Sequence, residues 1–142
     1  MRITFVDDSF AFDGHSPSSR ALNGPEKAFA LLPTSLAMRG HNVEIFNRCE
    51  FPVNADGVVW HPWDDERPAE TEALVAFRHA RLFEAVPQAA RKFLWMPGSP
   101  ALLDEDTSRA MLAKHRPTIV FFPSTRRTLT SYGSSPWTRA AA

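Results

Sequence analysis

The chain lacks most of the features that assign a protein to a specialised class. A single cysteine, Cys49, cannot form a disulfide within the chain or a cysteine cluster around a metal. No apolar run approaches the roughly 20 residues that a membrane-spanning helix needs. The apolar run at residues 3–6 is also too short for a signal peptide. We therefore expect a cytoplasmic protein and leave a peripheral membrane contact open.

An excess of charge of one sign is also missing. Lys+Arg and Asp+Glu both number 16, so the formal net charge is zero. A nucleic-acid-binding protein usually carries a basic excess on one face, so we expect no nucleic-acid partner. Zero net charge also means little repulsion between copies, which leaves a homodimer open. The length of 142 residues is common for one domain.

The best-known glycine and metal signatures are absent. The first apolar run is not followed by Gly-x-Gly-x-x-Gly, and the sequence has neither a P-loop nor a Gly-x-Ser-x-Gly elbow. Neither His-Glu-x-x-His nor a spaced set of cysteines and histidines is present. We expect no metal site, and the pattern assigns no catalytic residue.

What the sequence does contain is an alternation of short apolar runs with helical patterns. Strands are predicted at residues 3–6, 43–46, 58–60, 73–77, 92–96 and 119–122. Helices are predicted from residue 24 to about 39, at 81–90 with an interruption at Pro87, at 104–115 with Asp104 as a cap, and at 125–131. Strands that alternate with helices predict right-handed crossovers and a parallel sheet.

The predicted fold class is therefore α/β, a Rossmann-like three-layer domain with a mainly parallel sheet. We place this domain at residues 1–133, and residues 134–142 are either a frayed tail or the start of a missing continuation.

The first helix shows the most local detail. Phe29, Leu32 and Leu36 are spaced to share one buried face. Pro33 lacks the N–H that the carbonyl four residues earlier needs, which predicts a kink. Gly40, just past the helix, is expected to be a left-handed cap.

Ligands of open parallel sheets bind beyond the carboxyl ends of the strands, so the residues after each strand are candidates. The turn at residues 23–26 ranks first, because Gly24 and the amide N–H groups behind it could meet an anion or a sugar hydroxyl, with Glu26 as a cap or an acceptor. An ordinary helix start without a ligand-binding role would explain the same residues. Arg78 could anchor a phosphate or carboxylate, or pair with the acidic residues 64–66. His15, in the long loop at residues 9–23, could contact a sugar or have no role.

Paired acids at Asp7 and Asp8 raise a separate alternative. Two carboxylates after a first strand can hold Mg²⁺ in phosphate-receiving signalling domains. Such a domain also needs an aspartate after the third strand and a lysine after the fifth. Asp64 and Asp65 come several residues too late, and the fifth predicted strand runs into Met96. The receiver-like function is therefore a minor alternative.

Several of these motifs together are similar to a known pattern. The opening strand, the long loop, Asn-Gly-Pro-Glu at 23–26 and Arg-Gly-His-Asn-Val at 39–43 resemble the amino-terminal domain of GT-B glycosyltransferases, most closely family 4 (group 1). Members commonly carry Gly-Gly-x-Glu in the turn and Arg-Gly-His-x-Val at the end of the helix. The loop at 13–20, Ala-Phe-Arg at 76–78 and His-Arg-Pro-Thr at 115–118 add to the resemblance, which spans residues 1 to about 130.

The resemblance implies the acceptor-binding half of an enzyme that moves a sugar from a nucleotide-sugar donor to a hydroxyl acceptor. The implied partners are a sugar or glycan acceptor and a missing carboxy-terminal domain that holds the donor, a UDP- or GDP-sugar. Substrate-binding roles are implied for Gly24 and Glu26, and we add His15 and Arg78 as cleft candidates. The isolated half is expected to be inactive.

Two positions depart from the family pattern. Asn23 replaces the first glycine of the turn, and Pro97 and Gly98 stand where relatives often carry a His-Asp pair. No catalytic residue is therefore carried over. The alternative function is a non-catalytic module that binds a glycan or a partner protein.

Overall fold

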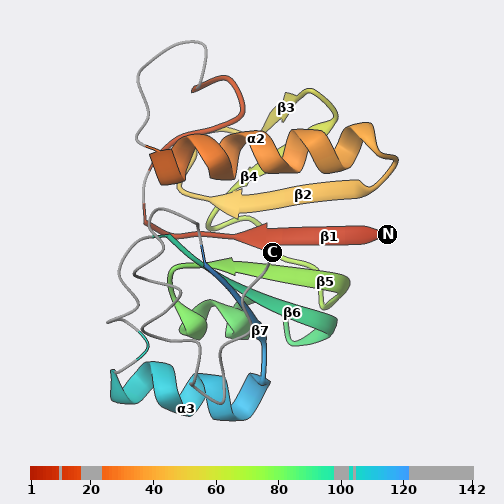
Figure 1. Cartoon of the computed structure of the whole chain (residues 1–142). Helices are drawn as coiled ribbons and strands as arrows, with labels where there is room; N and C mark the ends of the chain where they lie inside the picture. The colour runs from red at the N-terminus through yellow and green to blue at the C-terminus, as the bar shows by residue number, and fades with distance from the viewer. Residues whose placement is uncertain (10, 17–23, 98–102, 104, 122–142) are drawn as a thin grey trace.

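The structure is a computed structural model, and it describes residues 1–9, 11–16, 24–97, 103 and 105–121. A sheet of seven strands forms its centre (Figure 1). The strands are β1 (Arg2–Val6), β2 (Asn42–Asn47), β3 (Val53–Ala55), β4 (Val58–Pro62), β5 (Glu70–Phe77), β6 (Gln88–Met96) and β7 (Thr118–Phe121). All neighbouring pairs are parallel except β3 with β4. The α/β class and the mainly parallel sheet are therefore confirmed.

The order of the strands is that of a doubly wound sheet. From one edge to the other the strands run β3-β4-β2-β1-β5-β6-β7. When the six parallel strands alone are numbered along the chain, the order becomes 3-2-1-4-5-6, the order of a Rossmann-type sheet. The small antiparallel strand β3 extends this sheet at the β4 edge. The sequence prediction missed β3 because a three-residue edge strand carries almost no periodic signal.

Helix α2 (Gly24–Met38) connects β1 to β2 and packs on one face of the sheet. Its amino end lies on the side of the sheet toward which the β1 and β2 arrowheads point (Figure 1). The helix continues through Pro33, which is buried against the sheet together with Phe29. The prediction that Leu32 is buried is wrong, since 40% of Leu32 is exposed. Position 33 faces the sheet because it lies one turn after Phe29.

The end of α2 is capped as its sequence predicts. Gly40 has a φ of 91°, in the left-handed region that glycine adopts without strain. The Gly40 N–H donates to the carbonyl of Ala37 (3.0 Å), and the His41 N–H donates to that of Leu36 (3.2 Å). This tight ending directs the chain into β2, which begins at Asn42.

Alternate residues of the strands build two separate cores. Ile3, Phe5, Ile45 and Trp60 belong to a cluster that includes Phe29 of α2. Side chains of successive strand residues point to opposite faces, so Val6, Phe46, Leu74 and Leu94 form a second cluster on the other face. The sheet is therefore the middle of three layers.

The second face is covered by a 3₁₀ helix η1 (Ala80–Ala85) and by α3 (Asp106–His115). The predicted helix at 81–90 is wrong in its second half, because residues 88–90 belong to β6. Val86 is extended, and Gln88 and Ala89 pair with the start of β5, which outweighs their helical pattern. Helix α3 begins at Asp106, with Glu105 before it, and the predicted cap Asp104 lies outside the described residues.

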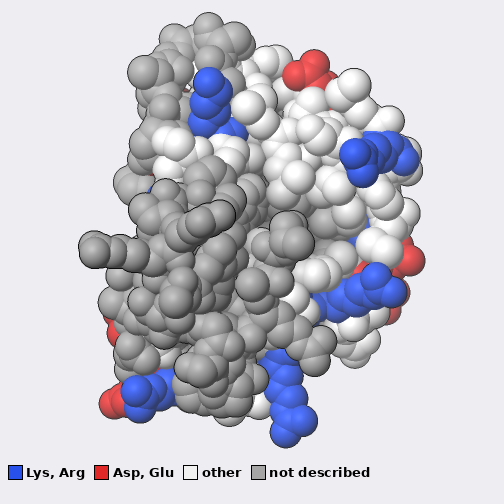
Figure 2. Space-filling view, viewed as in Figure 1, with Lys and Arg blue, Asp and Glu red and all other residues white. Residues whose placement is uncertain are grey.

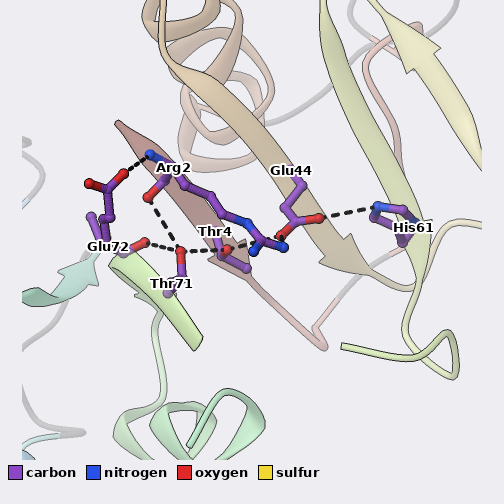
Figure 3. A network of polar contacts seen from close by, with 7 residues as sticks. Arg2, Thr4, Glu44, His61, Thr71 and Glu72 are labelled. Atoms are coloured by element: carbon purple, nitrogen blue, oxygen red, sulfur yellow. Dashed lines mark hydrogen bonds and ion pairs between the residues drawn. The ribbon is translucent and has the colours of Figure 1, made fainter. Parts of the chain in front are cut away.

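The crossover from β4 to β5, residues 63–69, contains no helix. It leads from β4 past β2 and β1 to β5. The sheet next to this crossover carries polar side chains (Figure 3). Arg2 donates to Glu44 (3.0 Å), and Nε2 of His61 lies 3.6 Å from the other oxygen of Glu44. The ring of His61 stacks on Phe46 at 4.6 Å. A hollow of about 280 Å³ is lined by these residues and by residues 66–69.

The described surface shows where charge is concentrated and where it is missing. In Figure 2 lysine and arginine side chains lie at separate places around the rim, and the area over α2 is largely uncharged. Leu31, Leu32 and Met38 of α2 are exposed. In the part of the chain that the structure describes, no helix has the length and apolar character needed to cross a membrane. The predicted helix at 125–131 and the tail at 134–142 lie outside the described residues.

Candidate ligand site at the carboxyl edge

The strand order reverses between β1 and β5. The chain leaves β1 toward α2 on one face and leaves β5 toward η1 on the other face. In doubly wound sheets such a reversal opens a crevice beyond the carboxyl ends of the two strands, where ligands bind. Here those ends carry Asp7, Asp8 and Ser9 after β1 and Arg78 and His79 after β5.

Asp7 is the most enclosed of these residues, with none of its surface exposed. Its N–H donates to the Phe46 carbonyl (3.0 Å), which continues the ladder between β1 and β2 by one residue. Its Oδ1 accepts hydrogen bonds from the N–H and the hydroxyl of Ser9, while its Oδ2 is buried and has no partner. Burial raises the pKa of Asp7, although the Ser9 hydrogen bonds and the charge of Arg78 oppose that effect.

Asp8 has the opposite environment. Arg81 of η1 donates to both of its carboxylate oxygens (2.7 and 3.1 Å), and Nε of Arg48 donates to its carbonyl. Burial acts to raise the pKa of Asp8, but the hydrogen bonds and charge of Arg81, with the nearby His79 and Arg48, outweigh it and lower the pKa. Two adjacent aspartates thus have pKa values shifted in opposite directions, a separation often found at functional sites.

Arg78 lies at the same edge, in an unusual backbone conformation. Its φ of 71° is in the left-handed region, which is uncommon for a residue with a side chain. Its N–H donates to the Trp95 carbonyl (2.9 Å), and its guanidinium carbon lies 5.0 Å from the centre of the Phe77 ring. Phe77 belongs to the cluster under α2, so the Arg78 side chain extends toward the α2 side of the edge. The acidic residues 64–66 were the alternative partners expected for Arg78. Of these, Asp65 lies 3.6 Å from Nδ1 of His61.

Gly24 and Glu26 lie in the first turn of α2, at the end of the helix that faces the carboxyl edge (Figure 1). Gly24 is exposed, and a Cβ atom added to it would meet nothing within 4 Å. Glu26 is half-buried. The N–H groups of a first helical turn have no partner within the helix, so this end of α2 can donate to a ligand. Asn23 lies outside the described residues.

His15 lies in a loop, at residues 11–16, that is firmly held beside the end of β2. The side chain of Asp13 accepts from the N–H of His15 (2.8 Å), and the hydroxyl of Ser16 accepts from the N–H of Asp13 (2.9 Å). The Asn47 amide donates to the carbonyl of Phe12 (2.6 Å). His15 itself is exposed. A hollow of about 280 Å³ is lined by residues of this loop and by Cys49, Glu50, Phe51 and Val53.

The structure brings Arg78, Gly24 and Glu26 to one edge of the sheet, and His15 to a loop that borders the end of β2. The sequence prediction missed Arg81, whose position in a predicted helix gave no reason to place it beside Asp8. For Asp7 and Asp8 it considered a Mg²⁺ pair or a solvated loop residue, whereas the Asp7 side chain is fully buried. The described residues include no group of three or more His, Cys, Asp or Glu side chains placed to hold a metal ion.

Comparisons with protein-family models, with curated proteins and with solved structures gave no match to this chain.

Proposed function

We propose that the chain is the acceptor-binding half of a GT-B glycosyltransferase. In this proposal the carboxyl edge binds the hydroxyl-bearing acceptor, a sugar or glycan. A carboxy-terminal domain holds a UDP- or GDP-sugar donor. The resemblance of the turn at 23–26 and of Arg-Gly-His-Asn-Val at 39–43 to family 4 supports this function, and the Rossmann-type strand order is compatible with it.

One observation carries the proposal. Groups that suit a polyhydroxyl ligand lie along the edge where the strand order reverses. The amino end of α2 offers N–H donors, Arg78 offers a guanidinium, and Glu26 offers a carboxylate. Sugar hydroxyls both donate and accept hydrogen bonds, so a mixed set of donors and acceptors matches them better than a purely cationic pocket would.

The chemistry follows from the position of this half in a two-domain enzyme. Closure of a cleft over the acceptor excludes water and orients its hydroxyl against the donor. Helix amino ends and basic side chains can stabilise the negative charge of a departing diphosphate. The residues of this chain then bind and orient the acceptor.

A titration followed by amide NMR tests the binding part of the proposal. We expect methyl α-glucoside, methyl α-mannoside or myo-inositol to shift the amide signals of Gly24, Glu26 and Arg78. Arg78→Gln should weaken that binding, and Arg39→Gln, at the other end of α2, should not. Shifts confined to the opposite edge of the sheet, or none with any of the three compounds, would contradict the proposal.

A transfer assay tests the enzymatic part. With UDP-glucose or GDP-mannose and the same acceptors, we expect no turnover from these 142 residues alone. Robust transfer would show that the chain is not half of an enzyme.

The alternative is a non-catalytic module that binds a glycan or a partner protein. Asn23 in the turn and Pro97 after β6 favour it, because both replace residues that the enzymes commonly carry. The reading frame of the gene separates the two. A continuation of about 200 residues (on the order of one further domain) with a glutamate-bearing donor motif supports the enzyme, and a stop codon after Ala142 supports the module.

The receiver-like alternative has less support. On the side of β1 away from β2 lies β5, and the residue that follows β5 is Arg78. A phosphate-receiving domain needs an acid at that place, and Arg78 is a cation. Labelling with acetyl phosphate and Mg²⁺ should therefore give no modified chain.

A further inference from the structure

One carboxylate oxygen, at the place where the strand order reverses, makes no hydrogen bond within the fold. Among the described residues, two buried side-chain polar atoms lack a hydrogen-bond partner, Oδ2 of Asp7 and Nδ1 of His41. A buried acceptor without a partner costs stability, and the cost is larger for a charged group. Asp7 is the one of the two that lies at the carboxyl edge.

The local turn does not require this second oxygen. Both hydrogen bonds from Ser9 go to Oδ1, and the backbone N–H of Asp7 is paired with Phe46. An asparagine at position 7 would offer the same single acceptor to Ser9 without the buried charge. The carboxylate is therefore more costly than the fold needs, which points to a role outside the fold.

The position of Asp7 directs its side chain toward the α2 side of the edge. Ile3 and Phe5 of β1 pack in the cluster under α2, and the next residue of that alternating series is Asp7. Arg78 reaches over Phe77 on the same side, and it is close enough to influence the pKa of Asp7. The oxygen thus belongs to the same edge as the amino end of α2.

The charges around Asp7 select the kind of group that can approach it. Arg48 and Arg81 hold the neighbouring Asp8, and Arg78 and His79 follow β5. A cationic ligand group would meet these positive side chains, whereas a hydroxyl donates a hydrogen bond and carries no charge. An uncharged donor therefore suits Oδ2 best, and on a sugar that donor is a hydroxyl.

We infer that Asp7 is a specificity-determining residue, whose second carboxylate oxygen accepts a hydrogen bond from one hydroxyl of the bound ligand. This inference rests on the proposed function and narrows it to ligands with a hydroxyl at that point. Since Asp7 is fully covered, the edge has to open around it before the hydroxyl can reach the oxygen.

The test compares Asp7→Asn with Asp8→Asn in the chain, by NMR titration with methyl α-glucoside, methyl α-mannoside and myo-inositol. Asp7→Asn keeps one acceptor for Ser9 and replaces the second oxygen by an N–H₂ donor, so binding should weaken about tenfold or more. Asp8→Asn, a matched change next to it, should have a much smaller effect. Equal binding by Asp7→Asn and the unchanged chain would overturn the inference and leave the proposed function standing. Binding of none of the three by the unchanged chain would overturn both.

Thermal unfolding gives a second readout that a purely structural Asp7 would not produce. The raised pKa of Asp7 means that its ionisation opposes folding, so the stability of the unchanged chain falls as pH rises from about 3.8 through the folded-state pKa. Asp7→Asn removes this loss and should melt at the same temperature or higher, most clearly above that range. A large fall in its melting temperature would show that the carboxylate supports the fold, and would overturn the inference.

Discussion

Asp8 and Arg81 are joined by two hydrogen bonds, Nη1 to Oδ2 at 2.7 Å and Nη2 to Oδ1 at 3.1 Å. The pair connects the end of β1 to η1, which follows β5 in the sequence. The pair therefore links the two segments that lie on the η1 side of the carboxyl edge, next to the point where the strand order reverses.

The Asp8–Arg81 pair should make a modest, pH-dependent contribution to stability. Half of the Arg81 side chain is exposed, so we expect a coupling of about 1 kcal/mol or less in a double-mutant cycle with Asp8→Asn and Arg81→Gln. The pKa of Asp8 is lowered, so this contribution is present above its unfolded value of 3.8 and is lost as pH falls through the folded-state pKa. Urea unfolding at pH 7 and near pH 3 measures it, and a coupling that grows toward acid would contradict the prediction.

Gly14 and Gly24 should differ in how much stability they lose on replacement by alanine. A Cβ on Gly14 would lie 2.5 Å from Cβ of Ala55 and 2.7 Å from Nε1 of Trp60, so Gly14→Ala forces the loop away from β4. We expect a loss of about 1–3 kcal/mol in the free energy of unfolding. Gly24→Ala meets open space and should change that free energy by less than about 0.5 kcal/mol. Circular dichroism in urea compares the two, and equal losses would show that the loop does not pack on Trp60.

Phe29 and Leu32 test which face of α2 is buried. The Phe29 ring lies 4.6 Å from that of Phe77 and 5.7 Å from that of Phe5, and none of its surface is exposed. Phe29→Ala should cost about 3–5 kcal/mol. Leu32→Ala, on the exposed side, should cost less than about 1 kcal/mol. If Leu32→Ala proved the more costly in the same denaturation experiment, the rotation of the helix would have to be different.

Cys49 should react slowly with thiol reagents. Burial, with the nearby charge of Asp13, raises the pKa of its thiol to about 11 from a usual 9.0. Such a rise lowers the thiolate fraction at pH 8 about 100-fold, and burial restricts access further. We expect Ellman's reagent to label the folded chain at least 100-fold more slowly than the same chain in urea at that pH. Comparable rates would mean that Cys49 is open to solvent.

Much of the fold could be predicted because each central strand is an apolar run long enough to be recognised. The runs at 3–6, 43–46 and 73–77 all became strands, and their alternation with helices correctly indicated a mainly parallel sheet. The apolar spacing of α2 was less informative, since Leu32 is exposed and Pro33, for which only a kink was predicted, is buried. A proline is compatible with the buried face because its ring adds apolar surface there.

The parts that the sequence did not predict depend on contacts between distant residues. Gln88 and Ala89 are strand residues because β5 lies beside them, and not because of their own preferences. The unpartnered oxygen of Asp7 is likewise invisible in the sequence, because it results from what surrounds the end of β1. The rule that ligands bind at strand ends did place Arg78 and the start of α2 at one edge.

The central position of β1 has a consequence for synthesis on the ribosome. Its two hydrogen-bonding neighbours, β2 and β5, begin about 40 and 70 residues further along the chain. A nascent polypeptide therefore carries an apolar segment, ending in Val6, whose second edge stays unsatisfied until Phe77 has left the exit tunnel. Throughout that interval the unpaired edge of the segment can pair wrongly with other chains, so slow codons before β5 should lower the yield of correctly folded protein.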